Sequence, residues 1–242
     1  MNKLVVLLLA SIISSSVFAR TYTLLTSEPV RSAKQEVSAE ELFIEVIKEA
    51  LKRADVSLRV DQGPWIQAQR TVTRASDEDH YLIAPLTRIS QREDKYDWIL
   101  PLANYRLQFV TTDRNIDISN IESLKKEPVC VYRESAGEYK LKEMDFPDIL
   151  SRVLVQNCYK ELKSGKLKVV LAHGERIGKA LYEQVGGKPD DLIFGRPFSE
   201  YTVYLAATKG AVPELLKQDL LKALDEMKID GTYDKIFSKY RK

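Results

Sequence analysis

The sequence predicts an α/β protein, and three observations support this fold class. Segments of β-forming composition alternate with amphipathic helical segments near the N-terminus, in the order β-α-β-α-β. A second alternating series begins at Pro128, and the chain closes with helical segments at 213–227 and 232–240. The first series favours a parallel sheet, and such sheets bind ligands near the carboxyl ends of their strands.

Residues 1–19 resemble a secretory signal peptide rather than part of the fold. Lys3 supplies a positive charge, residues 4–13 are apolar, and Val17-Phe18-Ala19 fits the small-x-small cleavage pattern. A membrane-spanning helix needs about 20 apolar residues, and the serines at 14–16 interrupt this run too early. We therefore expect a secreted, periplasmic protein that starts near Arg20. Retention of the segment as an anchor is the alternative.

The composition describes an ordinary soluble globule, with 44% hydrophobic and 30% charged residues. The mature chain of about 223 residues leaves room for two small lobes or one large domain. Removing residues 1–19 takes away Lys3 and no acid, so the formal net charge falls from +2 to +1. This near balance argues against nucleic acid as a partner, because nucleic-acid-binding proteins concentrate basic charge.

In the first series, Ser38 and Glu41 form a capping box that begins a helix with apolar residues at helical spacing up to Leu51. Pro64 suits the first turn of the next helix, and Pro85 is expected to end the third strand. The predicted strands are 22–26, 56–60 and 81–84, with the second helix at 65–76. After them, strands are predicted at 105–112, 128–132, 152–155, 167–172, 191–194 and 201–207, and short helices at 138–144, 159–164 and 177–184.

Cys130 and Cys158 are the two cysteines of the chain, 28 positions apart. In an oxidising compartment such a pair is compatible with one disulfide. The flanking segments are predicted to be a strand at 129–132 and a strand end at 154–157, which permits the two residues to be adjacent. Two separately buried thiols are the alternative, and the sequence leaves both open.

A polar loop follows the third predicted strand and carries Thr87, Arg88, Ser90 and Arg92. Hydroxyl groups donate hydrogen bonds, and the planar guanidinium group of arginine matches a carboxylate. The loop therefore suits recognition of a small anion. Solvated arginines on a surface turn are the plain alternative, since arginine is mostly exposed.

Three islands resemble the family 3 periplasmic solute-binding proteins, the amino-acid-type receptors of ABC importers. They are the C-terminal segment 223–240, the element 162–168, and Thr87-x-x-x-x-Arg92 followed by Tyr96-Asp97-Trp98. The resemblance implies a two-lobe, Venus-flytrap architecture with two crossover strands that closes on a ligand. It places the first lobe at 20–104 plus 203–242 and the second lobe at 105–202.

The resemblance also implies roles for individual residues. Arg92 would hold the carboxylate of the ligand, and Thr87 and Ser135 would add hydrogen bonds. His173 falls where the family has an acidic residue that receives an ammonium group, and Glu175 is a possible substitute two positions later. Arg88 is a second candidate anchor for the carboxylate that the resemblance does not support, because the family usually has an apolar or small residue at that position.

Trp65 is a further candidate, as an aromatic wall of the ligand cleft. A tryptophan that begins an amphipathic helix is more often part of the core, and this reading stays open beside the first.

The sequence has no Gly-rich phosphate loop, nucleophile elbow or His-x-x-x-His zinc pair, so neither a cofactor nor a metal is expected. The leading hypothesis is a monomeric, non-enzymatic protein that captures a small anionic or zwitterionic solute for an ABC permease. One alternative is a small-acid dehydratase on the same scaffold, with Glu134 or Glu175 as general acid. Another is a ligand-sensing module for a signalling partner.

Overall fold

The computed structural model describes residues 20–30 and 38–241, and the predicted signal peptide lies outside them. In chain order the elements are β1 (Thr21–Thr26), α1 (Ala39–Arg53), β2 (Ser57–Gln62), α2 (Trp65–Arg74), η1 (Asp77–Asp79), β3 (Tyr81–Thr87), η2 (Ser90–Arg92), β4 (Asp97–Thr111), α3 (Ile121–Leu124), β5 (Val129–Tyr132), α4 (Ala136–Glu143), β6 (Ile149–Arg152), α5 (Val155–Lys163), β7 (Val169–Ala172), α6 (Glu175–Gln184), η3 (Pro189–Asp191), β8 (Ile193–Phe194), β9 (Ser199–Ala207), α7 (Glu214–Ile229) and α8 (Thr232–Arg241). Among these residues, no helix combines the length and the apolar composition needed to cross a membrane.

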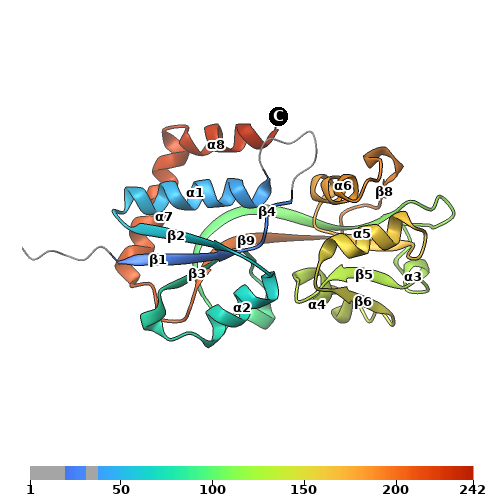
Figure 1. Cartoon of the computed structure of the whole chain (residues 1–242), viewed down its shortest axis with the longest axis horizontal. Helices are drawn as coiled ribbons and strands as arrows, with labels where there is room; N and C mark the ends of the chain where they lie inside the picture. The colour runs from blue at the N-terminus through green and yellow to red at the C-terminus, as the bar shows by residue number, and fades with distance from the viewer. Residues whose placement is uncertain (1–19, 31–37, 242) are drawn as a thin grey trace, which may run out of the picture.

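The elements form two lobes that share the long strands β4 and β9 (Figure 1). In the first lobe β1 pairs in parallel with β2 and β3, as the β-α-β-α-β order predicts. In the second lobe β5 pairs in parallel with β6 and β7. Strand β9 is antiparallel to both β3 and β4, and β4 continues beyond it to pair with β7. Strands β4 and β9 are therefore the two crossover connections.

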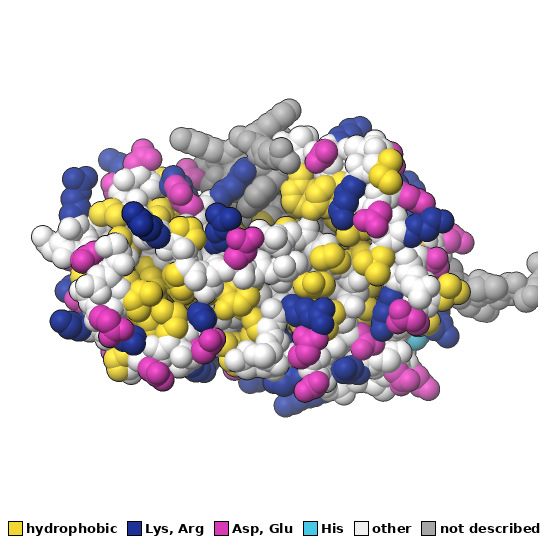
Figure 2. Space-filling view, turned by 180° about the vertical axis from the view of Figure 1, so that it is seen from behind, with side chains coloured by type: hydrophobic (Ala, Val, Ile, Leu, Met, Phe, Trp, Pro, Cys, Tyr) yellow, Lys and Arg dark blue, Asp and Glu magenta, His cyan; other side chains and the backbone are white. Residues whose placement is uncertain are grey.

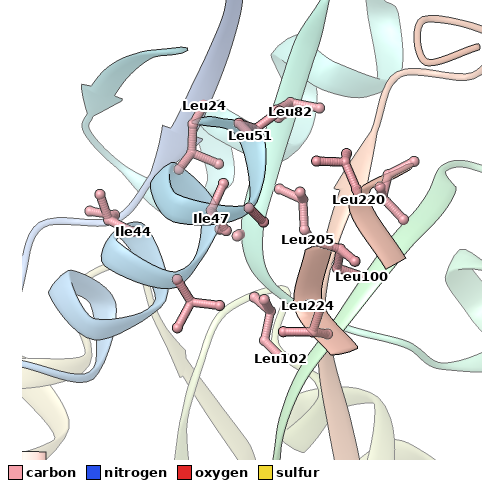
Figure 3. Close-up of a cluster of buried hydrophobic side chains, with 14 of the residues drawn as sticks. Leu24, Ile44, Ile47, Leu51, Leu82, Leu100, Leu102, Leu205, Leu220 and Leu224 are labelled. Atoms are coloured by element: carbon pink, nitrogen blue, oxygen red, sulfur yellow. The ribbon is translucent and has the colours of Figure 1, made fainter. Parts of the chain in front are cut away.

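Each lobe has its own apolar core, because alternate residues of a strand face opposite sides of the sheet. In the first lobe, α1 and α7 pack against one face through residues such as Leu24, Ile47 and Leu224 (Figure 3). Helix α2 covers the other face of that sheet. In the second lobe, Val170 faces the cluster of α5 and α6, whereas Leu171 faces that of α4.

Helix α1 begins as the sequence predicts. The Ser38 hydroxyl accepts the Glu41 N–H at 3.1 Å, and the Glu41 carboxylate accepts the Ser38 N–H at 2.9 Å. Replacing Ser38 by alanine removes a helix cap, so we expect a loss of about 1 kcal/mol in the free energy of unfolding. Urea denaturation measures it. Ser57→Ala, at an exposed position of β2, is the control and should change little.

Two predicted strands have the wrong bounds: the strand expected at 81–84 ends too early, and the strand expected at 105–112 begins too late. Strand β3 does not stop at Ala84 but runs through Pro85 to Thr87, and β4 begins at Asp97 and passes through Pro101. Proline cannot donate a ladder hydrogen bond, so it is tolerated in a sheet where pairing is irregular. The pairing of β3 with β9 shifts register between Ile83 and Leu86, and that of β4 with β9 shifts between Pro101 and Ala103.

The prediction around Cys158 was also wrong. The strand expected at 152–155 is β6 at Ile149–Arg152, and Cys158 lies in helix α5 rather than beyond a strand end. The β-branched residues Val153 and Val155 favoured a strand, but Cys158, Tyr159 and Leu162 give the helix a buried face that packing stabilises. The structure joins Cys130 of β5 to Cys158 by a disulfide, with 5.6 Å between their Cα atoms.

Candidate functional site at the junction of the lobes

Arg92 lies at the junction of the two lobes, in the turn η2 that follows β3. Its side chain is buried, with the residue only 3% exposed. Nη1 donates to the Thr87 carbonyl oxygen and Nη2 to Gln69 Oε1, each at 3.0 Å. Nη2 also donates to the carbonyl oxygen of Glu134, which belongs to the second lobe. Burial lowers the pKa of Arg92, and nearby tyrosines and Glu134 oppose this effect. One guanidinium group thus connects both lobes.

Gln69 completes this contact, and the sequence analysis missed it. It lies on α2, is 9% exposed, and places its amide nitrogen 3.5 Å from the same Glu134 oxygen. A signal was present in the sequence. Gln69 follows Trp65 by four positions, and Ala68 and Val72 lie on the same buried face. A polar side chain on a buried helix face needs a hydrogen-bond partner, and here the partner is Arg92.

The turn before α4 supplies the second-lobe part of the junction. Glu134 has a φ of 55°, and its N–H donates to the Glu138 carboxylate at 2.6 Å. Its own carboxylate accepts the Tyr139 hydroxyl at 2.8 Å, and the Tyr139 ring centroid lies 5.8 Å from Cζ of Arg92. Ser135 is buried and caps α4 by accepting the Glu138 N–H at 3.2 Å. The first-turn N–H groups of α4 therefore lie at the junction with Arg92, an arrangement that favours an anion.

Thr87, Tyr105 and His173 form a chain of contacts that leads from Arg92 into the second lobe. The hydroxyl oxygens of Thr87 and Tyr105 are 3.0 Å apart, and the Tyr105 and His173 rings meet edge to face at 5.4 Å. Burial raises the pKa of Tyr105 to about 12. Burial lowers the pKa of His173 to about 4, and the charge of Arg92 adds to this effect. The imidazole is therefore neutral at neutral pH.

His173 should make the stability of the protein depend on pH. Its pKa falls from 6.5 in the unfolded chain to about 4 in the folded protein. Below pH 6.5 the unfolded chain therefore binds a proton that the folded protein does not, and stability is lost as the pH falls toward 4. Between about pH 7 and about pH 4.5, the free energy of unfolding of the wild type should therefore fall by about 2 to 3 kcal/mol more than that of His173→Phe. Denaturation curves at both pH values measure the difference, and parallel pH profiles would contradict it.

Trp65 lies in a buried cluster rather than in an open cleft. It is 7% exposed and packs with residues such as Val72, Leu86 and Tyr96 of the first lobe. Tyr132 of the second lobe packs against the same cluster. Burial raises the pKa of Tyr132 to about 12, and the charge of Glu40 adds to it. Trp65 is thus a core residue of the first lobe that also contributes to the contact between the lobes.

Two of the candidate residues do not join Arg92. Arg88 is exposed, pairs with Glu93 and lies over the rings of Trp98 and Tyr204 at 5.4 and 5.6 Å. Glu175 begins α6, where its exposed side chain pairs with Lys179 at 2.5 Å. Over residues 20–30 and 38–241, no group of three or more His, Cys, Asp or Glu side chains could hold a metal ion.

A hollow of about 310 Å³ lies elsewhere, along α1 and α8 of the first lobe. Its lining mixes lysines with glutamates, and among them Lys239 pairs with Glu45. Such a mixed, solvated surface gives no single charge with which to select a ligand. The hydrogen-bonded groups that converge from two lobes make Arg92 and its partners the stronger candidate site.

Comparison with solved structures finds the same fold. An ancestral arginine-binding protein bound to arginine matches with a TM-score of 0.75 and 24% identity, over 92% of this chain and 99% of its own. A histidine kinase sensor domain with similarity to periplasmic binding proteins matches at 0.75 and 14% identity, over 91% and 96%. The GluR0 ligand-binding core from Nostoc punctiforme, in complex with L-glutamate, matches with a TM-score of 0.73 and 18% identity, over 90% of this chain and 98% of its own.

No family model matches the sequence, and comparison with curated proteins finds no match. The chain has the two-lobe fold of the periplasmic binding proteins, as its sequence predicted.

Proposed function

We propose that this chain is a divergent family 3 solute-binding protein that captures a small carboxylate-bearing solute between its lobes. The observation that carries the proposal is the buried guanidinium group of Arg92, which donates hydrogen bonds to groups of both lobes. Arginine has five N–H donors, and three hydrogen bonds to Thr87, Gln69 and Glu134 are present here. A ligand carboxylate would accept from the remaining N–H groups or replace the Glu134 carbonyl oxygen.

Closure of the lobes would couple ligand binding to a change in the conformation of the protein. The lobes are joined through β4 and β9, so they can rotate about these strands while each core stays packed. A ligand that contacts Arg92 of one lobe and the α4 turn of the other stabilises the closed state. We place the lobe boundaries at 104/105 and 202/203, close to Tyr105, which packs against the cores of both lobes.

The compartment and partners follow from this proposal. Residues 1–19 would direct the chain to the periplasm, where the Cys130–Cys158 disulfide is stable. An ABC permease would receive the solute from a monomeric binding protein. Basic and acidic side chains mix over the face in Figure 2, which does not favour nucleic acid.

The test is a thermal-shift screen of the purified protein against amino acids, dicarboxylates, hydroxy acids and small peptides. A ligand that binds only the folded state stabilises it by about 2.7 kcal/mol at 100 times its Kd. We expect carboxylates of one class to raise the Tm in a saturable way, and amines of matched size without a carboxylate to have no effect. A Tm that no carboxylate raises would refute the proposal.

A sensing role is the second candidate function. The observation that favours it is the match to a histidine kinase sensor domain over 91% of this chain. A sensor would pass the closed shape to a signalling partner, whereas a transport protein would pass on the solute itself. Deleting the gene and measuring uptake of the identified solute separates them, because only the transport role predicts slower uptake.

The dehydratase alternative receives less support from the geometry. The Glu134 carboxylate accepts a hydrogen bond from Tyr139, and Glu175 is exposed and paired with Lys179. We expect prephenate-like acids to be bound without turnover or not bound at all, and product analysis by mass spectrometry checks this.

A further inference from the structure

His173 has a polar atom that no other part of the described chain satisfies. Its Nε2 is buried and makes no hydrogen bond to any residue in 20–30 or 38–241. A buried polar group without a partner costs about 1–3 kcal/mol, so such an atom beside a candidate site points to a missing partner.

The position of Nε2 ties it to the anion end of the site. A Cβ atom added to Gly137 would lie 3.2 Å from Nε2, so the imidazole lies against the first turn of α4. That turn directs its N–H groups, and the positive end of the helix dipole, toward the junction with Arg92. On its other side His173 contacts the Tyr105 ring, whose hydroxyl reaches Thr87, and the Thr87 carbonyl oxygen accepts from Arg92. A ligand carboxylate held by Arg92 and α4 would thus bring its next substituent close to His173.

The charges around His173 decide which substituent fits. Arg92 is a cation, the N-terminus of α4 contributes a partial positive charge beside the Glu138 carboxylate of its first turn, and the imidazole itself is neutral. The neighbouring carboxylates are both engaged: Glu134 with the Tyr139 hydroxyl, and Glu138 with Lys142 at 2.8 Å and the Glu134 N–H. An ammonium group placed against His173 would lie near the Arg92 cation, and both neighbouring carboxylates are already hydrogen-bonded to other groups. A hydroxyl or carbonyl oxygen would only exchange a hydrogen bond with Nε2, as donor or acceptor according to the tautomer.

We propose that the solute is a hydroxy- or oxo-carboxylate rather than an amino acid, and that His173 Nε2 recognises the neutral oxygen next to the carboxylate. This inference rests on the proposed function, because it needs Arg92 to hold the carboxylate. It makes His173 the residue that determines specificity at the second polar group of the solute.

The experiment compares probes that differ in this one group. Wild-type protein is titrated with pyruvate against L-alanine and with L-malate against L-aspartate, by calorimetry at neutral pH. We expect the oxo or hydroxy acid of at least one pair to bind about ten-fold or more tightly than its amino counterpart, because a site built for one hydrogen-bonding group discriminates against a mismatched one. Equal or tighter binding of the amino acids overturns the inference.

Variants locate the effect at His173. His173→Phe keeps a ring of similar shape and should lose about ten-fold or more in affinity for the preferred acid, whereas His173→Gln should lose less because its amide still hydrogen-bonds. His173→Asp should shift the preference toward the amino acid. His80→Asn, at the other histidine of the chain, should leave all affinities unchanged. Unchanged binding of the preferred acid by His173→Phe would overturn the role of Nε2.

The two proposals fail in different ways. If amino acids bind best and Arg92→Lys abolishes their binding, the proposed function stands and the inference about His173 falls. Loss of amino-acid binding in Glu134→Gln would then identify Glu134 as the ammonium partner. If none of the four probes binds and the Tm screen also finds no carboxylate, both proposals fall. Circular dichroism and the ligand-free Tm of each variant show whether it is folded.

Discussion

Arg92→Lys is expected to abolish ligand-induced stabilisation and to destabilise the ligand-free protein. A lysine ammonium cannot reproduce the planar fork that reaches Thr87, Gln69 and Glu134 together, so buried acceptors lose their donor. We expect a loss of about 2 to 4 kcal/mol in the free energy of unfolding and about 100-fold or more in affinity for the solute. Denaturation by urea and calorimetric titration measure the two quantities.

Arg88→Lys is the matched control, since Arg88 lies four positions away on the same loop. Its guanidinium group is exposed and pairs with Glu93. We therefore expect a loss of less than about 1 kcal/mol in the free energy of unfolding and no change in affinity for the solute. If Arg92→Lys bound the solute as tightly as the wild type does, Arg92 would not be the carboxylate anchor. An equal loss in both variants would show that the loop, rather than Arg92 itself, is required.

Removing the disulfide is expected to have the largest effect on stability away from the site. The Cys130–Cys158 bridge closes a loop of 28 positions, for which the chain-entropy relation gives about 3 to 4 kcal/mol. Both residues are fully buried between β5 and α5, so alanine is the better replacement because it leaves no buried hydroxyl. The variant with Cys130→Ala and Cys158→Ala should therefore unfold at a lower denaturant concentration than the oxidised protein.

Reductant provides the control within the same experiment. Wild-type protein treated with dithiothreitol should approach the curve of the alanine variant, and the variant itself should not respond. Affinity for the solute should change less than stability, because the bridge lies among the α5 and α6 residues of the second lobe and does not touch Arg92. A reductant that opens the disulfide, as thiol labelling confirms, without shifting the wild-type curve would contradict the prediction.

The comparison of Arg88 with Arg92 shows what sequence patterns could and could not predict in this protein. Both arginines lie in one polar loop after a strand, and composition gave them equal standing. The motif Thr87-x-x-x-x-Arg92 favoured Arg92 as the ligand residue, and the structure buries Arg92 while Arg88 stays at the surface. The Arg88 side chain lies toward Glu93, and the Arg92 side chain lies toward Gln69 and Glu134. Which partners each arginine can reach depends on the packing of the whole lobe.

Features with a local cause were readable from the sequence alone. The capping box of α1 uses Ser38 and Glu41, three positions apart, and the β-α-β-α-β order follows from periodicity within each segment. The end of β3 and the start of α5 were misread, because local propensity at Pro85 and at Val153 and Val155 opposed the pairing and packing of the finished fold.

The sequence by itself determined the α/β class, the two series of elements, and Thr87, Arg92 and His173 as candidates. Only the tertiary structure decided that Arg92 joins Gln69, 23 positions away, to Glu134, 42 positions away. It also closed the disulfide that the spacing of Cys130 and Cys158 left open, and it buried Nε2 of His173 without a partner. The physical reason is that helix caps and periodicity act over a few residues, whereas these contacts form only after two lobes pack and meet.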